Sequence, residues 1–126
     1  MIDAVLIMRT YKSAWFAKAA RKAHITDREL CVAIAQVNLG QADDLGGGVF
    51  KKRLKKNEHR AIILSKAQGF WIYEYVFAKK DRDNIDEAEL KDFRLLVKSY
   101  ATLTAKQIDT LLSEKDWIEI CKETTP

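Results

Sequence analysis

The chain has 126 residues, of which 48% are hydrophobic and 32% are charged, and its formal net charge is +4 at pH 7. This length and apolar fraction predict a single domain over residues 1–126 and exclude an intrinsically disordered chain. The sequence contains no apolar run of about 18 residues, and no basic segment precedes its first apolar stretch. We therefore expect neither a membrane span nor a signal peptide, and we expect a cytoplasmic location.

The positive charge is concentrated in the middle of the chain. Residues 51–82 contain ten Lys or Arg and three Asp or Glu, which gives a net charge of +7. Residues 1–50 contain six basic and five acidic residues (+1), and residues 83–126 contain six and ten (−4). A local basic surface of this kind is typical of proteins that bind a polyanion such as nucleic acid.

The first third of the chain predicts a strand followed by two helices. Residues 4–8 form a short, branched apolar run, which indicates a strand. Over Tyr11–Ala23, apolar residues recur at helical spacing among basic ones, which predicts an amphipathic helix. A second helix is expected to begin at Thr26, because the spacing to Glu29 fits a capping box, and to end at Gly40. Their short connection predicts that the two helices pair as an α-hairpin.

Three strands with short connections are predicted next. Glycines 46–48 indicate a turn, although a glycine-rich loop can also bind phosphate through its backbone amides. The strands are expected over Val49–Lys56, Arg60–Ser65 and Phe70–Lys79, and the last is apolar on both faces, which is typical of a central strand. Together they predict an antiparallel meander, to which the N-terminal strand adds.

The last third of the chain predicts two helices. Capping spacings at Asp86–Glu89 and at Thr104–Gln107 mark the two helix starts. Trp117–Ile120 is short and alternating, and residues 113–126 are expected to form a partly ordered C-terminal tail. The order of elements predicts an α+β fold, in which an antiparallel β-sheet carries the N-terminal α-hairpin and the C-terminal helices on one face.

The two cysteines, Cys31 and Cys121, have neither CxxC spacing nor a histidine cluster near them. A zinc site is therefore not expected, and two reduced thiols are predicted. No other residue pattern indicates a cofactor or a metal, so none is expected.

The arrangement of the basic residues resembles that of the RelE/ParE superfamily. Lys51-Lys52-Arg53 lies on the first meander strand, Arg60 on the second, and the segment Phe77-Ala-Lys-Lys-Asp-Arg-Asp-Asn-Ile85 follows the third. This pattern is most similar to the RelE-type toxins of bacterial type II toxin–antitoxin modules. The stretch from Trp15-Phe16-Ala17-Lys18 to Gly40 also resembles the helical hairpin of that subfamily, and the similarity extends from about Lys12 to Leu112.

This resemblance implies ribosome-dependent cleavage of mRNA in the A site, with the ribosome and mRNA as partners. It also implies a cognate antitoxin that covers the basic face, in a toxin–antitoxin hetero-oligomer. Two alternatives stay open. The ParE branch of the superfamily inhibits DNA gyrase without cleaving RNA, and a basic domain can bind nucleic acid without any catalysis.

Metal-free RNA cleavage needs a base for the ribose 2′-OH, positive charge at the scissile phosphate and an acid for the leaving 5′-oxygen, and it yields a 2′,3′-cyclic phosphate. Arginine suits the phosphate because its planar fork forms two parallel hydrogen bonds, so Arg53, Arg60 and Arg82 are the expected phosphate clamps. A lysine acts as the base only if neighbouring positive charge lowers its pKa toward neutrality. The candidate bases are Lys51, Lys52 and Lys79.

Two sets of functional residues follow from the resemblance and this chemistry. The expected catalytic residues are Lys52, Arg53, Arg60, Lys79 and Arg82. The expected RNA-binding residues are Lys51, Lys55, Lys56, His59, Tyr75 and Lys80. Structural alternatives exist, because lysines also protect solvated sheet edges, His59 falls in a predicted turn and Tyr75 in a strand that can be core. Trp15 and Phe16 are interpreted as core residues or as a patch that faces the antitoxin.

Overall fold

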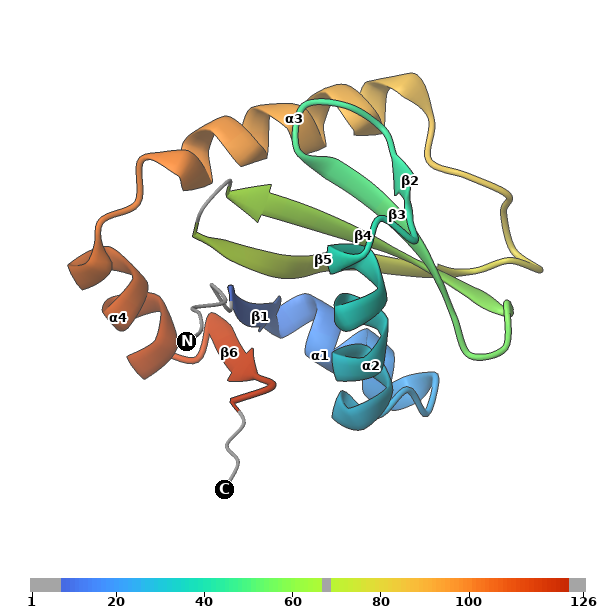
Figure 1. The fold of residues 1–126 in the computed structure, drawn as a ribbon, viewed down its shortest axis with the longest axis horizontal. Coiled ribbons are helices and arrows are strands. Elements are labelled where there is room, and N and C mark those ends of the chain that lie inside the picture. Colours follow the sequence, from blue (N-terminus) through green and yellow to red (C-terminus); the bar gives the residue numbers. More distant parts are fainter. Residues whose placement is uncertain (1–7, 67–68, 123–126) are drawn as a thin grey trace.

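The computed structural model describes residues 8–66 and 69–122, which form a mixed β-sheet with helices on both sides (Figure 1). Over these residues the strands are β1 (Arg9–Ser13), β2 (Asp43–Asp44), β3 (Val49–Leu54), β4 (His59–Lys66), β5 (Phe70–Ala78) and β6 (Trp117–Ile120). The helices are α1 (Ala14–Lys22), α2 (Asp27–Asn38), α3 (Glu87–Ala101) and α4 (Ala105–Ser113). The predicted α+β class is confirmed.

The N-terminal strand and the first helix meet at Ser13. The Ser13 hydroxyl accepts a hydrogen bond from the Phe16 amide at 3.0 Å and thereby caps α1. The prediction that this helix begins at Tyr11 is wrong, because Tyr11 belongs to β1 and is only 1% exposed. The strand predicted over residues 4–8 falls outside the described residues except for Met8, which lies in no strand.

The predicted starts of the other three helices are confirmed. Their N-cap side chains, Thr26, Asp86 and Thr104, each accept a hydrogen bond from the amide three residues later. The full capping box forms in α3 and α4, but not in α2, where the Glu29 carboxylate instead accepts a hydrogen bond from the Lys55 amide at 2.8 Å. This bond ties α2 to the β3–β4 turn. None of these helices, over the part of the chain that the structure describes, is long and apolar enough to cross a membrane.

The sheet has the strand order β2-β3-β4-β5-β1-β6. The meander from β3 to β5 is antiparallel, as predicted, and β5 lies inside the sheet, while β2, which was not predicted, pairs with β3 in antiparallel orientation. The prediction of a purely antiparallel sheet is wrong, because β1 pairs with β5 in parallel and with β6 in antiparallel orientation. Two helices and three strands separate β1 from β5 along the chain, which is the kind of long connection that parallel neighbours need.

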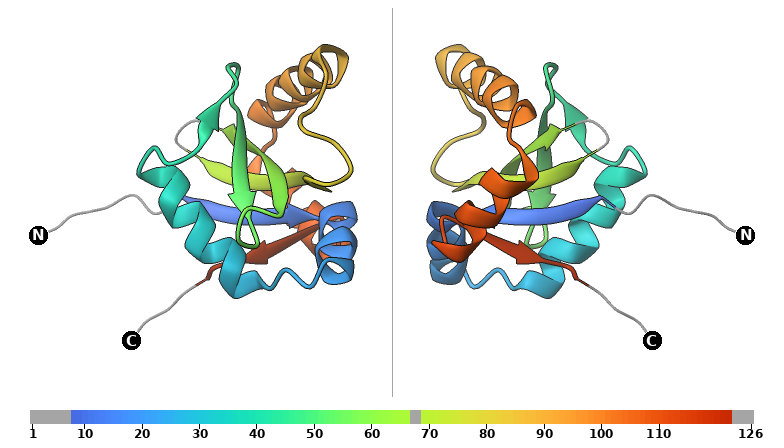
Figure 2. Two further views of the ribbon diagram at one scale, coloured as in Figure 1. Left: turned by 90° about the vertical axis from the view of Figure 1, so that its right-hand side faces the viewer. Right: turned by 90° about the vertical axis from the view of Figure 1, so that its left-hand side faces the viewer.

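Helices cover both faces of the sheet, so the prediction that they share one face is also wrong (Figure 2). On one face, Phe16 of α1 and Leu30 of α2 pack against Tyr73. On the other face, Phe93 of α3 packs against a cluster that includes Ile62. Neighbouring residues of β4 and β5 are buried on opposite faces, and both faces therefore need cover. The expected α-hairpin is not confirmed, since α1 packs on β1 and β5 while α2 packs on β3.

The glycines at 46–48 form the predicted turn, and all three have φ between +65° and +86°. Arg94 of α3 donates hydrogen bonds to the carbonyls of Leu45 and Gly46, so α3 is held against this turn. A Cβ on Gly48 would lie 2.8 Å from a methyl group of Val97. The glycines therefore permit both the backbone conformation and the close approach of α3.

The C-terminal segment contributes to the sheet. Trp117 and Ile120 of β6 are buried, so this part of the predicted C-terminal tail is ordered, while residues 123–126 of that tail lie outside the described residues. By pairing with β1, β6 carries Cys121 next to α2, where it forms a disulfide with Cys31. The prediction of two reduced thiols is therefore wrong, because the fold brings together two residues 90 positions apart.

Candidate functional site

Arg53 and Arg60 lie directly opposite each other on β3 and β4. Because side chains alternate along a strand, Arg60 shares a face with Ile62, which is the face that α3 covers. Opposed residues on antiparallel strands have Cβ atoms about 5 Å apart, and like charges at such positions destabilise the sheet. Fold stability alone therefore does not explain this arginine pair.

Arg60 is 9% exposed. Its Nη1 atom donates hydrogen bonds to the main-chain carbonyls of Asn57 at 3.0 Å and His59 at 3.2 Å. Among the described residues, no carboxylate forms an ion pair with it. Burying a guanidinium without a counter-charge is costly, and a bound anion would supply that charge.

Arg82 follows β5 and lies beside this pair. Its guanidinium carbon is 5.4 Å from the ring centre of Phe77, which is the register partner of Arg60. Both carboxylate oxygens of Glu89 accept hydrogen bonds from Arg82, one of them at 3.0 Å. These bonds raise the pKa of Arg82 and lower the pKa of Glu89. We call Arg53, Arg60 and Arg82 the arginine cluster.

Lys51 and Lys52 point to opposite faces of β3. Lys51 is two residues before Arg53 on β3, so its side chain points to the same face as the arginine cluster. Its Nζ is 3.8 Å from an Asp43 carboxylate oxygen. Lys52 lies on the face of α1 and α2, and its ammonium donates a hydrogen bond to the Gln41 carbonyl at 3.0 Å. Desolvation and the charge of Arg53 lower the pKa of Lys52. Lys52 thus leaves β3 on the face opposite to Arg53, although Lys51, Lys52 and Arg53 all line one hollow of about 330 Å³ beside β2.

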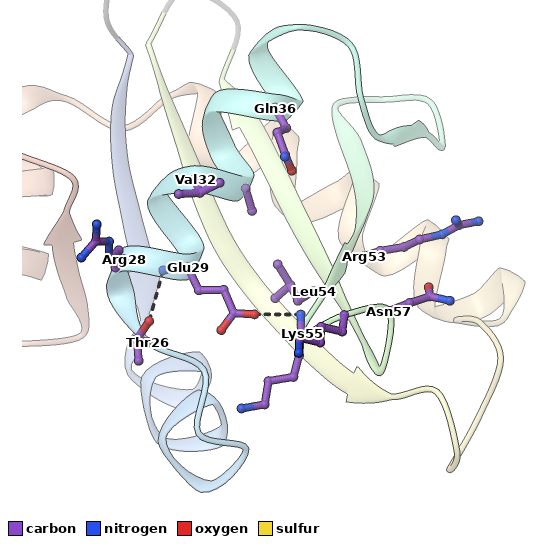
Figure 3. A pocket seen from close by; sticks show the side chains of 11 residues that line it. Thr26, Arg28, Glu29, Val32, Gln36, Arg53, Leu54, Lys55 and Asn57 are labelled. Carbon is purple, nitrogen blue, oxygen red and sulfur yellow. Dashed lines mark hydrogen bonds between the residues drawn. The ribbon is translucent and has the colours of Figure 1, made fainter.

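Lys55 and Lys56 belong to the β3–β4 turn, where both have positive φ. Lys55 is engaged with the α2 side of the molecule, since its amide binds Glu29 and its ammonium binds the His24 carbonyl. Together with α2, this turn encloses a hollow of about 450 Å³. Figure 3 shows Arg53 extending away from α2 while Lys55 lies beneath the helix. Lys55 therefore does not join the arginine cluster, while Lys56 also lines the hollow beside His59, Lys79 and Lys80.

His59 is the first residue of β4, so its predicted place in a turn is wrong. It is half-buried, and its Nδ1 atom is buried with no hydrogen-bond partner among the described residues. Nδ1 is therefore not accessible to a substrate proton in this conformation. Lys79 and Lys80, just beyond β5, are exposed and line hollows that His59 also lines.

Tyr75 lies at the side of the arginine cluster. It is the register partner of Ile62, and its hydroxyl is 3.5 Å from Arg82. Trp15 of α1 stacks on its ring, with centroids 5.1 Å apart and an angle of 24° between the ring planes. One face of Tyr75 is thus occupied, and the exposed aromatic surface at this place belongs to Trp15, which is 52% exposed.

Two contributors to this region are absent from the predicted site residues. Glu89 was predicted only as a capping residue, yet an acid in the first turn of a helix is also placed to meet a cation from the preceding loop. Trp15 belongs to a stripe with Ala19 and Lys22, at helical spacing, that differs from the buried stripe of Phe16. That second stripe is the sequence signal that could have separated Trp15 from the core.

The described residues contain no group of three or more His, Cys, Asp or Glu placed to hold a metal ion. A search of curated proteins and a search of solved structures gave no match. A family model, described as the RelE toxin of the RelE/RelB toxin–antitoxin system, matches residues 8–120. This match covers all six strands and all four helices of the described structure. The chain therefore belongs to the RelE toxin family, and it is the toxin of a toxin–antitoxin system with a cognate antitoxin as its partner.

Proposed function

We propose that this toxin is an endoribonuclease that cleaves mRNA on the ribosome and thereby stops translation. The observation that carries the proposal is the Arg53–Arg60 pair, in which two arginines are register partners on adjacent strands and the buried one, Arg60, has no acidic partner among the described residues. Such a pair matches a phosphate in charge and in hydrogen-bonding geometry. A target on the ribosome also implies a cytoplasmic site of action.

In the proposed reaction, the ribose 2′-oxygen attacks the neighbouring phosphorus and the bond from phosphorus to the 5′-oxygen breaks. The products are a 2′,3′-cyclic phosphate and a free 5′-hydroxyl. Arg53 and Arg60 stabilise the negative charge that grows on the phosphate oxygens, which is the largest effect expected from fixed cations. Arg82 contributes as a third cation once its bond to Glu89 yields to the phosphate.

Of the candidate bases, Lys51 has the placement that the reaction needs. It shares the face of Arg53 and Arg60, whereas Lys52 lies on the other face with its ammonium bonded to a carbonyl. We infer that Lys51 in its neutral form accepts the proton of the 2′-hydroxyl, and that water supplies a proton to the leaving 5′-oxygen. Replacing Lys51 by alanine should therefore lower cleavage more than replacing Lys52 does. Equal losses, or a larger loss at Lys52, would contradict this assignment.

The proposal is tested by mapping transcript 5′ ends after brief induction of the toxin, with translation active and with translation blocked. We expect new ends inside translated codons, free 5′-hydroxyl groups at these ends, and loss of the ends when translation is blocked. Induction of the DNA-damage response without new transcript ends would instead indicate a gyrase inhibitor. RNA binding without cleavage or growth arrest would indicate a non-catalytic nucleic-acid-binding module.

The antitoxin is expected to cover the arginine cluster in a hetero-oligomer. A basic surface left open would bind cellular RNA indiscriminately and in a salt-dependent way. Acidic side chains of the antitoxin would provide the counter-charge that Arg60 lacks, and apolar ones would cover the nearby aromatic rings. Arginine-specific modification should therefore reach Arg53 in the free toxin and fail to reach it in the complex.

A further inference from the structure

A groove of about 470 Å³ lies between α1 and the outer half of β5. β5 pairs with β1 only along residues 70–73, so its edge beyond this point has no neighbouring strand and faces α1 instead. A second hollow of about 850 Å³ adjoins the first, because both are lined by Lys22, His59 and Lys80. Hollows of this size are large enough for a nucleotide.

One wall of this groove presents an aromatic ring to solvent. Trp15 is 52% exposed and is the only aromatic residue among the large exposed hydrophobic residues of the described chain. Tyr75 supports one face of the indole by stacking, which holds the ring in place. A rigid indole with an open face is the platform on which proteins stack a single-stranded base.

The rest of the groove suits a sugar and a phosphate. Ala19, Ala23 and Ala78 lie along it, and these small side chains leave room beside the indole. The cations that line the two hollows are Lys22, Lys56, Lys79, Lys80 and Arg82, against the acids Glu58, Asp81 and Asp83. The lining is therefore net positive, which favours an anionic ligand.

The groove is continuous with the arginine cluster through Arg82. This residue lines the groove and also lies over Phe77, the register partner of Arg60. Tyr75 contributes to both places, since it carries the Trp15 stack and has its hydroxyl near Arg82. A chain of RNA with its phosphate at the arginine cluster would thus reach the groove with a neighbouring nucleotide.

We propose that this groove, here called the Trp15 groove, binds one unpaired RNA nucleotide next to the scissile phosphate. Its base stacks on the open face of Trp15, and its phosphate lies near Lys22 and Lys80. The inference rests on the proposed action on RNA, and it adds a positioning site outside the arginine cluster. Trp15 acts on substrate placement here and touches none of the reacting atoms.

The test uses full-length toxin and a short fluorescent RNA with 2′-O-methyl groups, which prevent cleavage, and it measures binding by anisotropy. Trp15→Ala should weaken binding about 5- to 100-fold, the range observed when one stacked base loses its aromatic partner. Trp15→Phe should retain most of the affinity, because phenylalanine also stacks. Leu39→Ala is the matched control, since Leu39 is an exposed hydrophobic residue directly after the last residue of α2 and does not line the groove.

A second measurement identifies the stacked base. A series of RNAs is made in which each carries an abasic site at a different position. For one of these RNAs, the affinity for wild-type toxin should be as low as the affinity of intact RNA for Trp15→Ala. The affinity of that RNA should be no lower for Trp15→Ala than for wild type, because the abasic site and the substitution remove the same stacking contact. Thermal unfolding of each variant shows whether its fold is retained.

Several outcomes would overturn the Trp15 groove. The first is binding by Trp15→Ala within two-fold of wild type, and the second is an equal loss with Trp15→Phe. The third is unchanged RNA binding together with a weakened antitoxin complex, which would assign the groove to the antitoxin. Failure of the proposed function looks different. In that case mRNA would stay uncut on ribosomes while oligonucleotide binding still depended on Trp15.

Discussion

Replacing Arg53 by alanine should abolish most activity without lowering stability. Arg53 is exposed and, among the described residues, its side chain makes no hydrogen bond or ion pair, while its opposed neighbour is Arg60. Removing one of two opposed like charges should relieve about 0.2–1 kcal/mol of repulsion. For a domain of this size the melting temperature should stay constant or rise by about 1–4 °C.

Cleavage should respond in the opposite direction. Loss of one fixed group that stabilises transition-state charge typically costs a factor of about 10²–10³ in rate. Arg60→Ala should lose activity to a similar extent, but it should also lose stability. It removes the two hydrogen bonds to the Asn57 and His59 carbonyls, each worth about 1 kcal/mol, and the relieved repulsion offsets part of this loss.

The assay compares cleavage of one mRNA on purified ribosomes at equal toxin concentrations, together with thermal unfolding of each variant. Lys106→Ala, on the exposed side of α4, is the control for loss of one positive charge, and its activity should stay within a few-fold of wild type. The reasoning is refuted if Arg53→Ala cleaves within three-fold of wild type. It is also refuted if the lost activity of Arg53→Ala is fully explained by a smaller fraction of folded protein.

Three further predictions concern stability. Burial raises the pKa of Glu74 to about 7, so folding favours its protonated form, and the unfolding free energy should fall as pH rises from about 4.5 to about 7. Glu74→Gln should therefore match wild type near pH 4 and exceed it by up to about 3 kcal/mol at pH 8 in urea unfolding. An equal difference at both pH values would contradict this. Gly48→Ala should lower the unfolding free energy by about 2–4 kcal/mol, because it adds a clash with α3 to the backbone strain at φ +86°. Gly40→Ala, which has φ +85° but open space around it, should lower the unfolding free energy by only about 1–2 kcal/mol. Equal losses of unfolding free energy would show that the clash is absent. Reduction of the Cys31–Cys121 disulfide should lower the unfolding free energy by about 2–4 kcal/mol in wild type and leave Cys31→Ser unchanged, and a wild type insensitive to reductant would argue against the bond.

Local signals in the sequence predicted local structure correctly. The caps at Thr26, Asp86 and Thr104 act over three residues, and each of them begins a helix as expected. The same kind of signal was available at Ser13, where the N-cap of α1 was missed because the apolar spacing continues back to Tyr11. The apolar periodicity correctly predicted a helix in this segment, but only the Ser13 cap marks where the helix begins, at Ala14.

Contacts between distant segments could not be predicted in this way. The parallel pairing of β1 with β5 and the approach of Cys121 to Cys31 both depend on how the whole sheet closes. The placement of helices on both faces was within reach, however. Ile62 and Ile63 are adjacent and both fully buried, and a strand that buries both faces needs a cover on each.

The candidate site shows how far alternation along a strand can be used. Alternation puts Lys52 on the face opposite to Arg53, although both residues were predicted to be catalytic. A short run of cations is divided by the pleat into two sets with different neighbours, so sequence adjacency is a poor measure of a shared site.

The energetics of the arginine cluster connect the toxin to its partner. Arg82 has a counter-charge within the chain, because both carboxylate oxygens of Glu89 accept hydrogen bonds from its guanidinium. Arg53 and Arg60 receive no such partner from the described residues, although they face each other and one of them is buried. Within the described part of the free toxin, these two charges therefore stay without a counter-charge. Under the proposed function, RNA phosphate and an acidic antitoxin would compete for the same two groups, and this competition would couple inhibition directly to the chemistry of the site.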